Sequence, residues 1–561
     1  MNLTEGQKAT GKENFTDVVN ITRRDFLTGT LAAGLATGAG LGSIYFGYGK
    51  SVGDPLRVGV LGTGDEGSVL LGAHNPDYLS VVAIADVRPY NVFRAFHGDV
   101  SSASAYTARP GLMAKYKWSG EDEARKQVKV YGAYEDLLAD DNVEAVIIAL
   151  PLHLHAEAAI KAMRAGKHVL TEKLMGHSVH ECKEMSRVSR ETGKILATGH
   201  QRHYSVLYDN AVYTIGKARL LGDLHSIRAQ WHRGNLPGND SWKPPMPGDE
   251  SLAKKLAGWK KDLDSAKPAD VAPLTKRIAQ LEAQISDTLV DATKYGYTPM
   301  TLADGSSRSP MEELIRWRLW NRTGGGLMAE LGSHQLDAAG IFVSAMHGEG
   351  KKVKPLTVTA IGNRSIFPAD REIDDHVYCM YEYPAPGYDQ DKNKKIVVTY
   401  SSINGNGFGD YGEVVMGTKG TLVLEREQDV MLYKGSAKDT RVTVAKGKDG
   451  APTLDTTESG GGGGPAASGK PGGDTAPPSR GYTEEMEHWA WCIRNPSPEN
   501  QPRCKPEVAI ADAVIALVSN IALANPETQS RIEFKPEWFD IASDETPEGV
   551  TPDTGRDRYK V

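Results

Sequence analysis

The sequence has 561 residues, more than one hydrophobic core usually supports, so we expect two or more domains or one domain with large insertions. Its 65 Lys and Arg against 72 Asp and Glu give a formal net charge of −7, which offers no electrostatic basis for binding nucleic acid. The four cysteines form no C-x-x-C pair, which argues against a disulfide framework and a cysteine-based zinc site. Glycine is enriched, at 60 residues, and much of the excess falls in 26–49 and 460–481.

The N-terminal 50 residues are typical of an export signal. Arg23-Arg24 precede an uncharged run over 26–49, the pairing found in twin-arginine signals. We therefore expect residues 1–50 to lie outside the folded body. We also expect the twin-arginine export machinery to carry the protein to the periplasm. No clear cleavage site ends the run, so retention as an N-terminal membrane anchor is the alternative.

Residues 55–202 alternate short apolar strands with helical segments, which predicts a doubly wound parallel sheet, the Rossmann dinucleotide-binding fold. A polar stretch, 97–127, is interpreted as an insertion between its strands. The strands are expected at 57–61, 81–87, 143–150, 167–171 and 195–198.

Residues 203–545 are richer in strands and predict a second, α+β domain with a mostly antiparallel open sheet, so the fold class is α/β overall. An insertion, 233–322, contains a one-faced helix over 274–289 that we expect to pack on the body or on a neighbouring subunit. The low-complexity segment 446–480 predicts a disordered loop. Strands are expected at 224–231, 356–362, 377–383, 396–401, 411–416 and 421–424, followed by closing helices at 483–494 and 507–524.

A glycine turn follows the first strand and points to a dinucleotide. Gly62, Gly64 and Gly67 provide a tight turn, room for a pyrophosphate and close helix packing. Asp86, at the end of the second strand, would bind the adenosine ribose and repel a 2′-phosphate, which favours NAD over NADP. Arg88 is the contrary feature, because an arginine there can serve a phosphate. A glycine turn of another α/β fold is the alternative.

Two acidic residues within that turn fit a pyrophosphate poorly. Asp65 and Glu66 complement the dipole of the following helix but bring negative charge to the expected phosphate site.

Three further segments carry a family resemblance. Pro151-Leu152-His153-Leu154-His155, Glu172-Lys173-Leu174 and the 324–337 segment GGGLMAELGSHQLD resemble the T-P-N-x-x-H, E-K-P and G-G-x-x-x-D-x-G-x-H-x-x-D motifs of the Gfo/Idh/MocA family. This family includes glucose-fructose oxidoreductase and inositol dehydrogenase, and the sequence is similar to its exported, twin-arginine-tagged branch. The resemblance covers 56–232 and 314–424. It implies a Rossmann domain followed by an α/β domain whose open sheet mediates homo-oligomers.

The sequence departs from the family pattern at three positions. Leu174 replaces the proline that often forms a cis peptide bond and helps aim the lysine. Leu152 replaces an asparagine, and Glu330 stands where inositol dehydrogenases carry aspartate.

The resemblance, together with the glycine turn, identifies candidate site residues. Oxidation of a secondary alcohol needs a group that accepts the hydroxyl proton, and Lys173 is the candidate, with His334 and Glu330 four residues apart on one helix face. His153-x-His155 and His200-x-x-His203 lack a third ligand at convincing spacing, so no metal is expected. The expected cofactor-binding residues are Gly62, Thr63, Gly64, Gly67, Asp86, Arg88, Pro151, His155, Glu172 and Gln201. The expected substrate contacts are Arg202, Asp337 and Trp320.

These residues predict an oxidoreductase that transfers hydride between a sugar, cyclitol or glycoside hydroxyl and a tightly bound NAD. Tight binding is expected because free nicotinamide cofactor is scarce outside the cytoplasm. One alternative is a redox-neutral NAD-dependent glycoside hydrolase or lyase that acts through a transient keto-sugar. Its relatives often lack the lysine of the E-K-P motif. A second alternative is a non-catalytic carbohydrate-binding protein.

Overall fold

The structure is a computed structural model that describes residues 3–19, 41–49, 52–348, 350, 352–435, 437–438, 444–446, 452–454 and 480–560. The predicted twin-arginine motif at 22–27 lies outside the described residues. The same holds for most of the predicted disordered loop 446–480. Among its described residues, β17 (Pro452–Leu454) pairs with β16 (Val444–Lys446), which ends where the segment begins.

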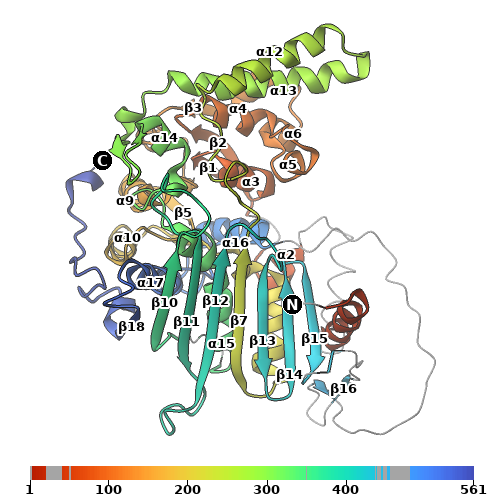
Figure 1. The fold of residues 1–561 in the computed structure, drawn as a ribbon, viewed down its shortest axis with the longest axis vertical. Helices are drawn as coiled ribbons and strands as arrows, with labels where there is room; N and C mark the ends of the chain where they lie inside the picture. The colour runs from red at the N-terminus through yellow and green to blue at the C-terminus, as the bar shows by residue number, and fades with distance from the viewer. Residues whose placement is uncertain are drawn as a thin grey trace.

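The N-terminal domain is a six-stranded parallel sheet in the order β3-β2-β1-β4-β5-β6 (Figure 1). This is the doubly wound order of dinucleotide-binding domains, so the predicted fold class is confirmed. Val58, Val60, Val146 and Ile148 are buried, as expected for strands covered by helices on both faces. The strands are β1 (Leu56–Leu61), β2 (Leu79–Ala85), β3 (Lys129–Tyr131), β4 (Ala145–Ile148), β5 (His168–Glu172) and β6 (Leu196–Gly199).

Helices connect these strands, and the polar stretch 97–127 folds into three short ones, α5 to α7. The helices are α3 (Asp65–Ala73), α4 (Pro89–His97), α5 (Ala103–Ala108), α6 (Gly111–Tyr116), α7 (Glu121–Gln127), α8 (Tyr134–Leu138), α9 (His155–Arg164) and α10 (Val179–Thr192).

The second domain is built on an eight-stranded sheet in the order β15-β14-β13-β7-β12-β11-β10-β18, in which only the β7–β12 pair is parallel. Alternate residues of β11 and β12 are buried, so one face of the sheet packs on the helices behind it (Figure 1). The strands are β7 (Leu224–His232), β10 (Thr357–Asn363), β11 (His376–Pro384), β12 (Lys395–Ile403), β13 (Tyr411–Gly417), β14 (Gly420–Glu425), β15 (Asp429–Lys434) and β18 (Arg531–Glu533).

The opposite face of this sheet carries exposed apolar side chains, among them Ile361, Tyr378 and Met380. Pairing with a second copy through the sheet stays a prediction. The main helices of the domain are α11 (Val206–Val212), α15 (Ser333–Ala345), α16 (Tyr482–Arg494) and α17 (Pro506–Ala524). Of the described helices, only α17 is long and apolar enough to cross a membrane. It is 67% buried and packs on β10, α10 and α15.

The insertion forms a helical hairpin, α12 (Glu250–Asp264) and α13 (Pro268–Ser286), that projects beyond the Rossmann domain (Figure 1). Because α13 packs on α4, the hairpin covers the edge of the N-terminal domain. Ile278 and Leu281 are buried as predicted, but the helix ends before Leu289, whose side chain is 83% exposed. The chain then continues through η4 (Asp287–Leu289), η5 (Ala292–Tyr295), β8 (Met300–Thr301), β9 (Ser307–Arg308) and α14 (Pro310–Ile315).

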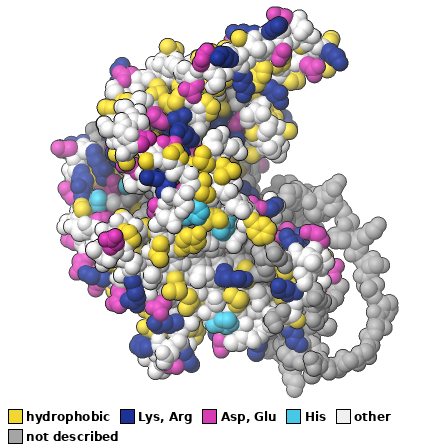
Figure 2. Space-filling model, in the orientation of Figure 1, with side chains coloured by type: hydrophobic (Ala, Val, Ile, Leu, Met, Phe, Trp, Pro, Cys, Tyr) yellow, Lys and Arg dark blue, Asp and Glu magenta, His cyan; other side chains and the backbone are white. Residues whose placement is uncertain are grey.

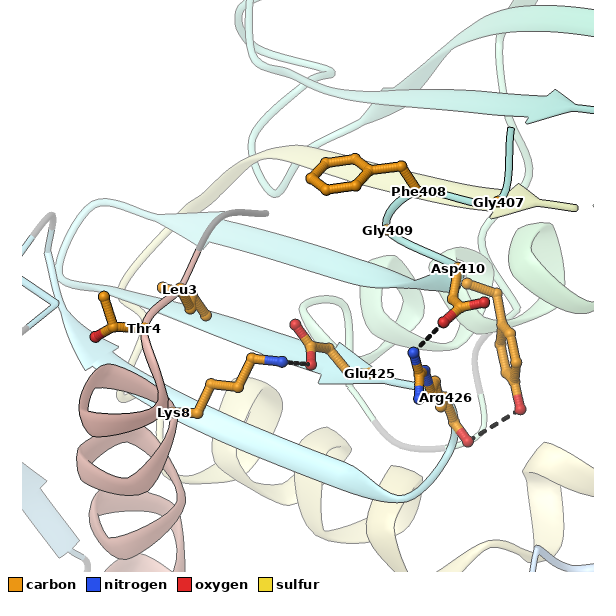
Figure 3. Close-up of a pocket in the computed structure, with 10 residues that line it drawn as sticks. Leu3, Thr4, Lys8, Gly407, Phe408, Gly409, Asp410, Glu425 and Arg426 are labelled. Carbon is orange, nitrogen blue, oxygen red and sulfur yellow. Dashed lines mark hydrogen bonds and ion pairs between the residues drawn. The ribbon is translucent and has the colours of Figure 1, made fainter. Parts of the chain in front are cut away.

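The expectation that residues 1–50 lie outside the folded body is wrong for both described parts of this segment. A helix over 5–19 packs beside β15, where Lys8 forms an ion pair with Glu425 at 2.8 Å (Figure 3) and Phe15 and Val18 are buried. On the far side of the gap, the buried Tyr48 donates a hydrogen bond to Glu487 at 2.6 Å.

Candidate functional site

A cleft of about 1260 Å³ lies between the two domains. It opens at the carboxyl ends of β1 and β4, where the strand order reverses and where doubly wound sheets bind their ligands. Its volume exceeds the roughly 300–1,000 Å³ of a pocket for one small molecule, so a dinucleotide and a substrate have room together. Figure 2 shows hydrophobic and basic side chains gathered at the level where the domains meet.

The glycine turn has the geometry that the fingerprint requires. Gly62 has φ +84°, and a Cβ there would lie 2.5 Å from the carbonyl oxygen of Ala149. A Cβ on Gly67 would lie 2.1 Å from the Gly62 carbonyl oxygen, so helix and turn touch. At Gly64 the nearest atom is Asn91 Nδ2, 3.9 Å away. Gly62 and Gly67 are therefore demanded by packing, whereas Gly64 leaves bare backbone at the N-terminus of α3, facing the cleft.

Asp86 lines the cleft and orders the turn beside it. Its carboxylate accepts hydrogen bonds from the peptide N–H groups of Thr63 at 2.8 Å and Arg88 at 2.9 Å, and from Asn91 Nδ2 at 3.1 Å. Thr63 thus contacts Asp86 and does not line the cleft. The Arg88 guanidinium forms an ion pair with the buried Asp287 of the insertion at 2.8 Å. Arg88 is therefore already neutralised.

The acidic residues at the N-terminus of α3 differ in their surroundings. Asp65 forms an ion pair with Arg94 at 2.6 Å. Burial raises the pKa of Glu66, against the opposing effect of Lys173. Burial also raises the pKa of Glu172 to about 8, and the neighbouring Glu66 adds to this shift. The two glutamates therefore hold their protons to higher pH than solvent-exposed carboxyl groups do.

Lys173 reaches across the cleft from β5 to the second domain. Its Nζ donates to the backbone oxygen of Glu330 at 2.8 Å, and the peptide bond from Lys173 to Leu174 is cis despite the missing proline. The His155 ring nitrogens lie 2.9 and 2.8 Å from the carbonyl oxygens of Leu174 and Leu150, which ties the lysine loop to the preceding strand.

The Glu330 carboxylate is held as an anion. Burial alone would raise its pKa, but Arg318, whose Nε donates to it at 2.9 Å, and Lys173 outweigh burial and lower the pKa. With its carboxylate and carbonyl both engaged, Glu330 fixes the wall opposite Lys173.

His334 lines the same cavity, four residues along the chain from Glu330. Burial lowers its pKa well below the ordinary value, and the cations of Lys173 and Arg202 lower it further. Its ring centroid lies 5.4 Å from that of Trp231. His334 is therefore a neutral imidazole in the same cavity as the Lys173 amine, an arrangement suited to moving a proton.

Four predicted contact residues lie behind the cleft wall. Arg202 is buried, donates to the backbone oxygen of His334 at 2.5 Å and pairs with Glu427 at 2.7 Å. Gln201, Asp337 and Trp320 are also buried and do not line the cavity. The prediction that these residues contact cofactor or substrate is corrected, because their motifs place the side chains inside the second domain. Arg202 instead fixes the backbone that carries His334.

Behind His334 lies a buried polar cluster. His200, Asp337 and Asp512 offer ligand atoms within 4.8 Å of one another. Lys352 Nζ lies 3.3 Å from Asp337 and 2.8 Å from Asp512. The lysine ammonium thus supplies the positive charge that this pair of acids needs.

Several residues of the cleft escaped the motif analysis. They come from the end of β7, the insertion, the start of β13 and the segment after the low-complexity tract: Trp231, Arg233, Trp242, Tyr411, Arg480 and Tyr482. Of these residues, only Trp231 could have been found from the sequence, because an aromatic side chain at a strand end suits a ring-shaped substrate.

The residues present fit a dinucleotide. The bare backbone at Gly64 can admit a pyrophosphate at the N-terminus of α3, and Asp86 lies where an adenosine ribose is expected. Pro151 and His155 line the cleft at the end of β4, while Glu172 and Lys173 line it at the end of β5.

Comparison with known proteins gives the class of this domain. Residues 56–200 match the Gfo/Idh/MocA family model, described as an oxidoreductase family with an NAD-binding Rossmann fold. This segment is therefore an NAD-binding Rossmann domain of that oxidoreductase type.

Curated relatives match over part of their length. The 1,5-anhydro-D-fructose reductase of Ensifer adhaerens is 35% identical over 107 residues, 19% of this chain and 30% of that protein. The dTDP-3,4-didehydro-2,6-dideoxy-alpha-D-glucose 3-reductase of Streptomyces violaceoruber is 26% identical over 208 residues, 36% of this chain and 53% of that protein. Three uncharacterized oxidoreductases, two from Schizosaccharomyces pombe and one from Rhizobium meliloti, are covered over 31–47% of their length, so the chain spans less than half of each.

A solved structure is similar over a longer stretch. The aldose-aldose oxidoreductase from Caulobacter crescentus, complexed with glycerol, is 13% identical, with 86% of this chain and 100% of that chain covered and a TM-score of 0.49.

Proposed function

We propose that the whole chain is a member of the Gfo/Idh/MocA family and an NAD-dependent oxidoreductase. Its reaction is hydride transfer between a secondary hydroxyl of a sugar, cyclitol or glycoside and a tightly bound nicotinamide cofactor. The observation that carries this proposal is one cavity that joins the glycine turn to Lys173, Glu330 and His334. The two sugar reductases among the relatives support a carbohydrate substrate.

When bound, NAD would supply the hydride acceptor, and the residues of the chain supply the proton chemistry. Lys173 takes the hydroxyl proton at Nζ, which the Glu330 carbonyl positions. His334, a neutral imidazole, orients the hydroxyl and carries the proton onward. Arg318 keeps Glu330 ionised, so its carboxylate serves as a hydrogen-bond acceptor for a second sugar hydroxyl.

NAD is the favoured form of the cofactor. Asp86 places a carboxylate at the adenosine end, and the nearby Arg88 is already paired with Asp287. The insertion also covers part of this end: Gln284 and Tyr295 line the cleft, and Gln280 accepts a hydrogen bond from the Val100 N–H at 2.7 Å. A partly covered adenosine end is consistent with slow release of the cofactor.

Export by the twin-arginine route is part of the proposal. Residues 41–49 lie partly buried on the folded body. We propose a periplasmic protein, and retention of the N-terminal segment as a membrane anchor is the alternative.

The test starts from purified protein. NAD should appear in the supernatant after denaturation. When the protein is incubated with a panel of glycosides, at least one should change the absorbance of the nicotinamide as hydride is transferred to it. Release of free sugar without net absorbance change would identify the hydrolase or lyase alternative. Absence of both released NAD and affinity for added NAD would refute the proposal and leave a carbohydrate-binding role.

A variant separates the proton chemistry from cofactor binding. Lys173→Met should abolish turnover and leave NAD bound, because the glycine turn and Asp86 are untouched. Unchanged turnover would exclude Lys173 as the proton acceptor.

A further inference from the structure

One arginine of the cleft has no acidic partner. Arg233 follows β7, and its peptide N–H donates to the Ile403 oxygen at 2.8 Å, which fixes the backbone. Its guanidinium lies 5.9 Å from the rings of both Trp231 and Trp242. Within the described part of the chain, this side chain forms neither an ion pair nor a hydrogen bond.

The other arginines of the cleft wall show what is unusual here. Each of the eight others, Arg318 and Arg480 among them, forms an ion pair with a carboxylate. The acids whose charges reach Arg233 are already engaged: Glu330 with Arg318 at 2.9 Å, and Asp240 with Arg371 at 2.6 Å. A charge removed from water without a partner is costly. Burial accordingly lowers the pKa of Arg233.

This cation lies at the reacting end of the cleft. The ring of Trp231 is near both Arg233 and His334. Its centroid lies 5.9 Å from the Arg233 guanidinium carbon and 5.4 Å from the centroid of the His334 ring. Trp231 also stacks on Tyr411 at 4.3 Å, which builds an aromatic wall beside the guanidinium. The glycine turn that suits a pyrophosphate belongs to the other domain.

Building on the proposed function, we propose that Arg233 is the anion-binding subsite of the substrate pocket and that the substrate is a carboxylated sugar, a uronic acid or its glycoside. A guanidinium presents two parallel N–H donors that match a carboxylate. The unpaired Arg233 guanidinium balances a carboxylate's one negative charge but by itself leaves a phosphate monoester undercompensated. The aromatic wall supplies the surface on which the sugar ring rests.

The experiment compares matched ligands on NAD-loaded protein by calorimetry. Methyl uronides and the corresponding neutral methyl hexosides, in gluco, galacto and manno configuration, are titrated in pairs, with hexose 6-phosphates as the phosphate arm. At least one uronide should bind roughly tenfold or more tightly than its neutral partner, and added salt should weaken only the uronide. Tighter binding of the phosphates than of the uronides, or no preference in any pair, overturns the proposal.

Variants assign the preference to this residue. Arg233→Met should remove the uronide preference, and Arg233→Lys should keep part of it. Arg322→Met is the matched control, since Arg322 also lines the cleft but is paired with Glu313 at 2.5 Å, and it should keep the preference. A preference that survives in Arg233→Met refutes the assignment.

Cofactor binding distinguishes the two possible failures. NAD affinity, measured separately, should be equal in the wild-type protein and Arg233→Met. If the wild-type protein binds no NAD, the proposed function fails. If it binds NAD and oxidises neutral sugars as well as uronides, only the anionic subsite fails.

Discussion

The three glycines of the turn can be separated into structural and ligand-facing positions by one substitution each. Gly62→Ala introduces a Cβ 2.5 Å from a backbone oxygen at φ +84°. Gly67→Ala introduces one 2.1 Å from the Gly62 oxygen. Gly64→Ala meets no atom closer than 3.9 Å, at φ −63°. The first two should destabilise the protein itself, whereas the third should act only on the ligand.

The magnitudes follow from these contacts. A left-handed backbone costs a residue with a Cβ about 1–2 kcal/mol, and overpacking against rigid backbone adds about 1–3 kcal/mol. Gly62→Ala should therefore lower the free energy of unfolding by roughly 2–5 kcal/mol, and Gly67→Ala by at least about 1–3 kcal/mol. Gly64→Ala should cost below about 1 kcal/mol, the loss expected at an N-cap. It should nevertheless weaken NAD binding by roughly tenfold or more, because the Cβ fills the space that a pyrophosphate needs.

Chemical unfolding of the cofactor-free protein measures the first effect, and calorimetric titration with NAD measures the second. The discriminating result is Gly64→Ala with a near-wild-type unfolding midpoint and a weakened NAD affinity. If Gly64→Ala binds NAD as tightly as the wild-type protein does, the pyrophosphate does not lie at the N-terminus of α3, and the cofactor position inferred here is wrong.

Three further predictions concern the adenosine end, the buried carboxyl pair and the N-terminal helix. Asp287→Asn releases Arg88 from its ion pair and should raise the ratio of NADP to NAD affinity about tenfold in paired titrations; an unchanged ratio would contradict the role given to that pair. Glu172 keeps its proton in the folded protein up to a pKa of about 8, whereas the unfolded chain loses it near 4.5, so the free energy of unfolding should fall as pH rises between these values. Glu172→Gln should remove that slope in denaturant titrations, and Glu66→Gln should reduce it. Deleting residues 3–19 should lower the free energy of unfolding by roughly 3 kcal/mol, because two buried apolar side chains are lost; an unchanged midpoint would mean that the helix is not docked in solution.

Much of the fold was predictable from apolar runs. Five of the six Rossmann strands and six of the eight strands of the second sheet form where the pattern indicated. β3 was missed because Lys129–Tyr131 is short, polar and exposed, so no apolar run marks it. β18 is a three-residue edge strand that forms only because β10 is beside it. β3 and β18 thus each depend on a neighbour distant in the sequence. The third strand that was not predicted, β15, does carry an apolar run over 430–433.

The candidate site was predictable where a motif dictates backbone geometry. Gly62 is fixed by its positive φ and by the neighbouring Ala149, Gly67 by its contact with Gly62, and Lys173 follows directly from a strand end. Arg202 was wrongly predicted to contact the substrate. Its side chain instead pairs with Glu427, 225 residues away, and the sequence gives no sign of that contact. Arg233 belongs to no motif. Its candidacy as a substrate-binding residue rests on the folded cleft, where no described carboxylate forms an ion pair with it.

Asp65 and Glu66 seemed incompatible with a pyrophosphate, but residues distant in the sequence offset their negative charge. Asp65 is neutralised by Arg94, which also pairs with Asp99 at 3.3 Å. Burial raises the pKa of Glu66, which weakens its tendency to carry a negative charge relative to an exposed glutamate. With Asp65 paired and the pKa of Glu66 raised, the helix dipole and the bare backbone at Gly64 favour an anion at this position. The phosphate site therefore depends on burial of Glu66, and Glu66→Asp, which shortens the side chain and admits water, should weaken NAD binding more than Glu66→Gln does.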